Sequence, residues 1–226
     1  MVRLLSLMVE PMSLRKLMSN EALRMKMMGR WFDLMHGPHE ISIFNQINHM
    51  YSEPIRHYHT LKHIDVLLTR QEEFFPDAGD TVKLAIWFHD IFYIPGYTDN
   101  ERVSADIFHA LMKDTVSMWY GLSAKVQSMI LATKNHVPCF EGEEIIIDLD
   151  LSGLADKSEN YDFTTSLVRA EFGKYTDEEW AMGRRAFLQG MLAKERIYHT
   201  ELFRSGDWEE RARANLEREL ALYGGE

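Results

Sequence analysis

Six histidine and aspartate residues stand beside apolar stretches of the sequence, where an unpartnered polar group is costly to bury. They are His59, His63, His89, Asp90, Asp148 and Asp150. One divalent cation would give several of these side chains a partner at once, and a mixture of imidazoles and carboxylates suits zinc, iron, manganese or cobalt. Three or four protein ligands with open coordination positions are typical of a catalytic metal site. The residue types therefore predict one or two divalent ions per chain, with magnesium as a further candidate.

The spacing of the histidines indicates how they could be brought together. His59 and His63 are four residues apart, so they would project from one face of a helix. The adjacent His89 and Asp90 end an apolar run and would lie at the end of another helix.

Two carboxylates compete for the last ligand position. Asp148 and Asp150 follow the run Ile145-Ile146-Ile147, which is the only strand-like stretch of the sequence and too short to build a sheet. Either carboxylate could be the ligand on this pattern alone, and either could instead cap a helix.

The elements that must position these residues are helices. Apolar residues recur at steps of three and four along most of the chain. The predicted helices cover residues 12–35, 40–51, 57–74, 81–91, 101–114, 116–136, 160–172, 177–199 and 207–223. With six prolines and no linker-like segment, we expect one all-α domain over 21–226, preceded by an extension over 1–20.

Composition excludes several classes of function. The 226 residues carry a net charge of −10, which disfavours an extended nucleic acid or an anionic membrane as partner. The single cysteine excludes an intrachain disulfide and favours a reducing compartment. Because no apolar run approaches the ~20 residues of a membrane span, we expect a cytoplasmic protein without membrane contact.

The order of His63, His89-Asp90 and Asp150 resembles the HD-domain superfamily of metal-dependent phosphohydrolases. The segment 58–66 is similar to a histidine-rich signature of the cyclic-nucleotide phosphodiesterases, a branch of that superfamily. Over residues 25–220 the chain more closely resembles the bacterial predicted metal-dependent HD phosphohydrolases. The matching segments are Arg56-His57-Tyr58-His59, Phe88-His89-Asp90, Asn100-Glu101, Ser104-Ala105, Thr133 with His136, Asp148-Leu149-Asp150-Leu151 and 212–216.

This resemblance implies a single-domain HD-type helical bundle that cleaves a phosphomonoester or phosphodiester, most simply of a nucleotide. The implied metal ligands are His63, His89, Asp90 and Asp150. It favours Asp150 over Asp148 through the Asp-Leu-Ser order, which leaves Asp148 as an acid that orients a ligand. His59 matches the position of a general acid that protonates the leaving group after metal-activated water attacks phosphorus.

Further residues complete the predicted site. An acidic protein needs a local positive site for phosphate, and the candidate contacts are Arg56, Lys62 and Lys134. His136 would bind the substrate or a second metal ion. Glu101 would hydrogen-bond a metal-bound water or orient His59. In addition, Tyr93 and Tyr97 could stack a nucleobase, whereas His57 is expected to be structural.

Two other functions stay open at this point. Some HD-fold proteins are di-iron oxygenases, in which an additional histidine such as His136 would be a ligand. The chain could also be a non-catalytic nucleotide-binding module, although such modules usually lose metal ligands and this chain keeps the full set.

Overall fold

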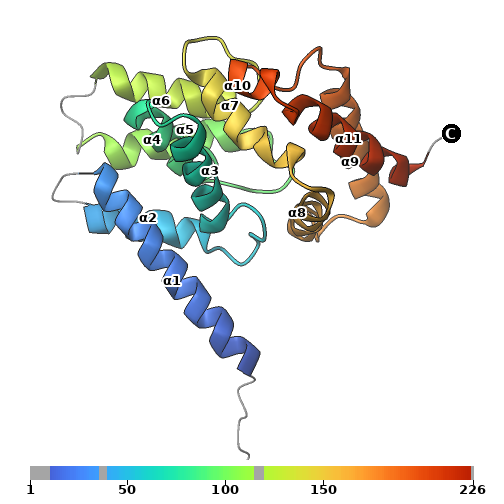
Figure 1. Cartoon of the computed structure of the whole chain (residues 1–226). Coiled ribbons are helices and arrows are strands. Elements are labelled where there is room, and N and C mark those ends of the chain that lie inside the picture. Colours follow the sequence, from blue (N-terminus) through green and yellow to red (C-terminus); the bar gives the residue numbers. More distant parts are fainter. Residues whose placement is uncertain (1–10, 36–39, 115–119, 225–226) are drawn as a thin grey trace, which may run out of the picture.

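The protein is a bundle of helices, as its periodicity predicts (Figure 1). The computed structural model describes residues 11–35, 40–114 and 120–224, and this part of the chain contains no strand. Its helices are α1 (Pro11–Leu34), α2 (Glu40–Tyr51), α3 (Leu61–Phe74), α4 (Gly79–Phe88), α5 (Asn100–Met112), α6 (Tyr120–Ala132), α7 (Glu143–Leu151), η1 (Ser152–Ala155), α8 (Ser158–Glu171), α9 (Asp177–Ala193), α10 (Glu201–Ser205), α11 (Trp208–Leu220) and η2 (Ala221–Tyr223). The all-α fold class is confirmed.

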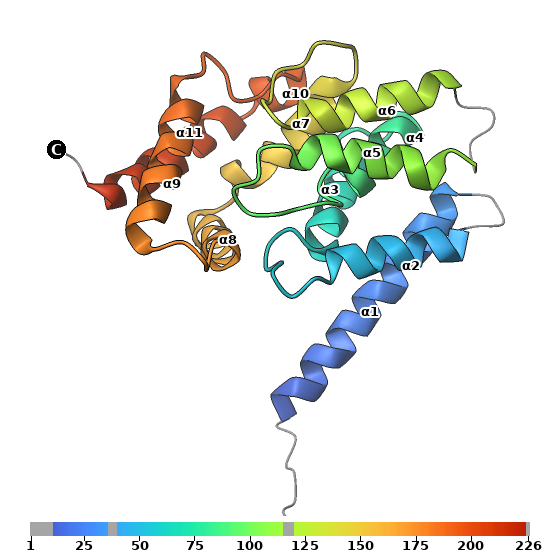
Figure 2. The ribbon, with the colours of Figure 1, turned by 180° about the vertical axis from the view of Figure 1, so that it is seen from behind.

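Two hydrophobic cores lie on either side of α7, which runs between the two groups of helices in Figures 1 and 2. The first core gathers buried side chains of α1–α7, including the fully buried Trp31 and Trp87. The second gathers side chains from the end of α7 through α11. Adjacent residues of the isoleucine run contribute to both cores, since Ile146 belongs to the first core and Ile147 to the second. The run that looks strand-like in the sequence is therefore the buried centre of a helix.

Several predicted helices differ from the structure at their ends, and specific hydrogen bonds accompany two of these differences. The helix predicted from residue 57 begins at Leu61, where Thr60 caps it by accepting a hydrogen bond from the Lys62 amide. The helix predicted to reach residue 199 ends at Ala193, because the amides of Ile197 and Tyr198 donate to the Glu209 carboxylate instead of continuing the helix. Glu209 lies 12 and 11 residues from the two amides, so the local sequence pattern does not mark the end of α9.

The N-terminal helix α1 is continuous from Pro11 to Leu34, so the boundary predicted at residue 20 falls inside a helix. Its first half projects away from the bundle (Figure 1). Its second half supplies Met27 and Trp31 to the first core. The predicted helix break at Gly37-Pro38 lies outside the described residues.

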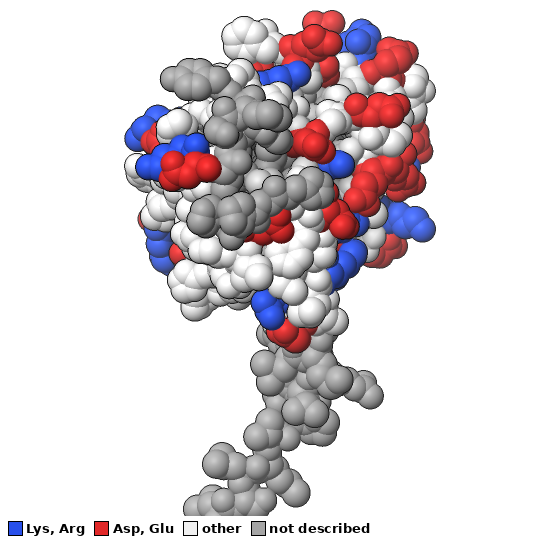
Figure 3. Space-filling view, turned by 90° about the vertical axis from the view of Figure 1, so that its left-hand side faces the viewer, with Lys and Arg blue, Asp and Glu red and all other residues white. Residues whose placement is uncertain are grey.

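The surface carries the excess of acidic residues. On the face drawn in Figure 3, Asp and Glu side chains occupy more of the visible described surface than Lys and Arg do. Within the described ranges, no helix combines the length and apolar character that crossing a bilayer requires.

Candidate metal centre

The four side chains predicted as metal ligands converge. His63 lies in the first turn of α3, His89 and Asp90 directly follow α4, and Asp150 lies near the end of α7. Each offers one ligand atom, and the four atoms lie within 4.8 Å of one another. Three separate elements thus bring two imidazoles and two carboxylates to one point, and this cluster could hold a metal ion.

The spacing of the ligand atoms suits a divalent ion. The Nε2 atoms of His63 and His89 are 3.4 Å apart, and each lies 3.5 Å from Oδ1 of Asp150. Ligands about 2.1 Å from a common ion lie about 3.0–3.4 Å from one another in octahedral or tetrahedral geometry. The observed separations therefore need only small adjustments to close around an ion.

The hydrogen bonding of His89 shows that its Nε2 atom needs a cation beside it. Its Nδ1 lies 3.0 Å from the carbonyl oxygen of Ile86, to which it can only donate. In the neutral ring, Nε2 then carries a lone pair, and it faces Oδ2 of Asp90 at 2.9 Å. Two acceptors at this distance repel each other unless a cation lies between them, and a proton or a metal ion would serve.

The electrostatics of the metal-free cluster follow from this arrangement. Burial opposes protonation of His89, but Asp90 and Asp150 outweigh it and raise the pKa of His89 well above its usual value. Burial would raise the pKa values of the two aspartates, but the histidines lower both below the usual range. For His63, burial dominates and lowers the pKa. The metal-free site thus keeps both carboxylates ionised and stores a proton on His89.

Asp148 faces away from this cluster. Residues two apart in a helix point about 200° apart, so Asp148 and Asp150 lie on nearly opposite sides of α7. The Asp148 carboxylate accepts hydrogen bonds from the amides of His199 and Thr200 and from the Thr200 hydroxyl. Asp148 therefore fixes the segment after α9, and the expectation that it orients a metal ligand is not met.

His59 reaches the cluster from a loop. Because α3 begins only at Leu61, the premise that His59 and His63 share a helical face is wrong. The loop nevertheless brings Nε2 of His59 to 3.9 Å from Oδ2 of Asp90. The His59 ring therefore lies beside the four-residue cluster and outside it.

A residue that the sequence did not single out, Glu171, holds this loop. One carboxylate oxygen, Oε1, accepts hydrogen bonds from the amides of His57, Tyr58 and His59 at 2.8, 2.8 and 2.9 Å. The other, Oε2, lies 2.6 Å from Nδ1 of His59. Burial lowers the pKa of His59, but Asp90 and Glu171 outweigh this effect and raise it above the usual value. Nothing in the sequence distinguishes Glu171 among the 35 aspartate and glutamate residues of the chain.

Two of the three predicted phosphate contacts are engaged by other groups of the protein. The buried guanidinium of Arg56 donates to the carbonyl oxygens of His59, Asp90 and Ile91 at 3.1, 2.7 and 2.8 Å. This residue therefore ties the His59 loop to the His89-Asp90 turn, and the structure gives it a supporting position. The exposed Lys134 pairs with Asp99 at 3.2 Å, and Lys62 is exposed on α3.

Two further predicted residues lie at the edge of the cluster. Nε2 of His136 is 3.9 Å from Oδ2 of Asp150, and the His136 backbone adopts a left-handed conformation with φ of 53°. Glu101 is half-buried in the first turn of α5. Burial raises the pKa of Glu101, and Asp90 and Asp150 raise it further, so its carboxylate lies within the field of the cluster.

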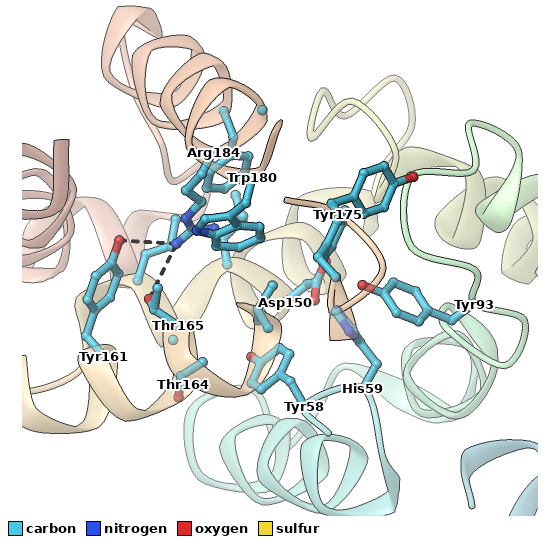
Figure 4. Close-up of a pocket in the computed structure, with 18 of the residues that line it drawn as sticks. Tyr58, His59, Tyr93, Asp150, Tyr161, Thr164, Thr165, Tyr175, Trp180 and Arg184 are labelled. Atoms are coloured by element: carbon cyan, nitrogen blue, oxygen red, sulfur yellow. Dashed lines mark hydrogen bonds between the residues drawn. The ribbon is translucent and has the colours of Figure 1, made fainter. Parts of the chain in front are cut away.

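A cavity of about 500 Å³ adjoins the cluster, with Asp150, His59 and His136 in its wall (Figure 4). Tyr93 also lines it and packs against the His59 ring, with 4.1 Å between ring centroids. Tyr97 is not among the lining residues and is 45% exposed. Much of the remaining wall comes from α8 and α9, which sequence reasoning left without a functional role.

Comparison of the chain with models of protein families, with curated proteins and with solved structures finds no match. The resemblance to HD phosphohydrolases therefore stays a prediction from the residues quoted above, and the site must be interpreted from its own geometry.

Proposed function

We propose that the protein is a metal-dependent phosphohydrolase that cleaves a phosphomonoester or phosphodiester. The observation that carries the proposal is the convergence of His63, His89, Asp90 and Asp150, with the His59 ring beside them. A bound divalent cation would polarise the phosphoryl group and lower the pKa of water to about 7. The superfamily resemblance of the sequence agrees with this chemistry.

The side chains around the cluster have distinct tasks in this reaction. Hydrolysis forms a bond from the water oxygen to phosphorus and breaks the bond to the ester oxygen, which leaves as an alkoxide and needs a proton. His59 is held through Nδ1 by Glu171 and directs Nε2 towards the cluster, so it can donate that proton. The Glu171 carboxylate at Nδ1 favours the protonated ring, which suits His59 to this role.

Supporting residues fix the positions of the reacting groups. Arg56 links the carbonyl oxygens of His59 and Asp90, and therefore couples the general acid to the ligand segment. Glu171, the last residue of α8, accepts hydrogen bonds from the amides of the same loop. This second set of contacts explains how a residue outside any helix can keep a fixed orientation.

The direct test is release of inorganic phosphate from a panel of phosphate esters, nucleotides included, by protein freed of metal and reloaded with Mn²⁺, Co²⁺ or Mg²⁺. The proposal expects release that depends on the added metal and is lost in the His89→Ala variant. Phosphate release that does not need metal would contradict the proposal. So would the absence of release for every combination of ester and metal.

A second candidate is a di-iron oxygenase, favoured by the additional imidazole of His136 near Asp150. Iron analysis separates the two functions. Two irons per chain, with oxygen consumption and no phosphate release, would favour the oxygenase.

A further inference from the structure

We propose that this site selects phosphate esters whose alcohol portion is uncharged and largely apolar, and that this portion occupies the cavity beside the metal centre. The inference rests on the proposed phosphohydrolase function and narrows its substrate class. It follows from the walls of the cavity, from the pairing of its charged groups and from the hydrogen-bonding groups that it offers.

The cavity has the size and lining of a site for a small organic molecule. Its volume of about 500 Å³ falls within the ordinary range for ligand pockets. Away from the cluster, its walls include Leu154, Val168, Phe172, Trp180 and Phe187. In Figure 4, Asp150 and His59 lie on one side of Trp180, and Tyr161, Thr165 and Arg184 lie on the other. A molecule whose phosphate meets the metal ligands would thus place its body against aromatic and aliphatic side chains.

The distal wall offers no free cation to a second anionic group. Arg184 is the only Lys or Arg among the lining residues, and its Nε and Nη2 donate to the two Glu219 oxygens at 2.8 and 2.9 Å. Its guanidinium also lies 4.8 Å from the Phe187 ring centroid. The lining Glu179 accepts a hydrogen bond from the Thr176 amide in a capping box. A second phosphate or a carboxylate in this part of the cavity would therefore meet no unpaired cation among the described lining residues.

The hydrogen-bonding groups of the cavity do not favour a nucleobase. Recognition of a base edge uses paired donors and acceptors, which Asn and Gln supply. The described lining residues include no Asn or Gln, and the hydroxyl of Tyr161 already donates to Glu219. The remaining lining hydroxyls belong to Tyr58, Tyr93, Tyr175, Thr164 and Thr165. The Tyr175 hydroxyl already donates to the Pro95 carbonyl oxygen and the Thr165 hydroxyl accepts from Arg184, so the hydroxyls suit isolated hydrogen bonds. The wall is therefore built for apolar contact more than for the recognition of a base.

A series of alkylphosphonates tests this inference by binding alone. Methyl-, butyl-, hexyl- and octylphosphonate resist hydrolysis, and they share one head group. Titration calorimetry with Mn²⁺-loaded wild-type protein should show affinity rising about two- to fourfold for each methylene that leaves water, until the cavity is filled. AMP and ADP serve as the nucleotide probes, and both should bind more weakly than hexylphosphonate.

Two glycines of α9 provide a matched pair of variants. Gly183 lines the cavity, and a Cβ placed there meets no neighbouring side chain or packed segment within 4 Å, so Gly183→Leu can extend into open space. Gly190 is in the same helix, is equally unobstructed and does not line the cavity. Gly183→Leu should weaken hexylphosphonate binding at least tenfold and leave methylphosphonate binding unchanged, whereas Gly190→Leu should change neither.

The outcomes separate the two proposals. Equal affinity along the wild-type series, tighter binding of AMP than of hexylphosphonate, or the same effect from both glycine variants would overturn this inference. In each of these cases a measurable affinity for methylphosphonate leaves the proposed phosphohydrolase function standing. If no phosphonate binds the Mn²⁺-loaded protein, the proposed function fails and the inference fails with it.

Discussion

The Glu171 carboxylate lies 2.6 Å from Nδ1 of His59, although 112 residues separate the two in the chain. The same carboxylate accepts three consecutive backbone amides, so it holds both the imidazole and the loop that carries it. The last residue of α8 therefore determines how a histidine next to α3 faces the cluster of His63, His89, Asp90 and Asp150.

The first prediction concerns His59 itself. Replacing His59 with Ala should slow metal-dependent phosphate release about 10²–10⁴-fold, the usual scale for loss of a general acid. Metal content should stay at the wild-type level, because the four ligands are intact. His57→Ala is the matched control, since its side chain is exposed and only its backbone contacts Glu171. Loss of the metal in His59→Ala would make His59 a ligand, and an unchanged rate would remove its catalytic role.

The second prediction concerns Glu171 and pH in the metal-free protein. His59 has a raised pKa, so the protonated ring stabilises the folded protein. This contribution is complete below about pH 6.5 and is lost as the pH rises through the raised pKa. Burial opposes ionisation of Glu171, but His59 and the loop amides lower its pKa to about 2. The contribution of the ionised Glu171 to the stability of the fold is complete above about pH 4.5 and is lost as the pH falls towards its folded-state pKa of about 2.

Glu171→Gln should therefore lower the free energy of unfolding by about 1–3 kcal/mol, and by more at pH 5.5 than at pH 8.5. Urea unfolding in the presence of a chelator measures this difference. An equal loss at both pH values would contradict the His59 pairing. A larger loss of unfolding free energy at pH 8.5 would show that Glu171 does not stabilise the protonated form of His59.

The third prediction separates the two acids of α7. Asp150→Asn should reduce bound metal strongly, because Asp150 faces the two histidines. Asp148→Asn should keep the metal and lower the free energy of unfolding by about 1–3 kcal/mol, since its three hydrogen bonds hold the His199-Thr200 segment. Metal analysis and thermal unfolding of both variants provide the comparison. The reverse pattern would show that Asp148 is the ligand.

The fourth prediction concerns Arg56. Arg56→Lys should destabilise the protein by about 2 kcal/mol or more, because one ammonium group cannot reach all three carbonyl oxygens. Lys134→Met is the comparison, and as an exposed pair with Asp99 it should cost at most about 1 kcal/mol. If Arg56→Lys keeps wild-type stability and raises KM, Arg56 contacts the substrate phosphate and its role is not mainly structural.

The sequence predicted what depends on local pattern. Apolar periodicity identified nine of the eleven α-helices in the described residues and missed α7 and the short α10. The His89-Asp90 pair at the end of an apolar run predicted two candidate ligands at the end of α4. The choice of Asp150 over Asp148 came from a resemblance, and helix geometry supplies its physical reason, since the two residues face opposite sides of α7.

Features that depend on distant partners were not predictable. The start of α3 is displaced because Glu171 takes up the amides of the preceding loop, and no local signal marks that contact. The engagement of Arg56 with backbone carbonyl oxygens arises only when the loop and the turn after α4 meet. The cavity walls from α8 and α9 have the composition of ordinary amphipathic helices, so their role appears only in the folded chain.

The measurement that tests the central claim most directly is anomalous X-ray diffraction, at the manganese absorption edge, from crystals grown with Mn²⁺. The account predicts a peak within about 2–2.5 Å of His63 Nε2, His89 Nε2 and carboxylate oxygens of Asp90 and Asp150. A second peak near His136 and Asp150 would add another ion to the same centre. Absence of a peak between these four residues, with manganese bound elsewhere or not at all, would contradict the account.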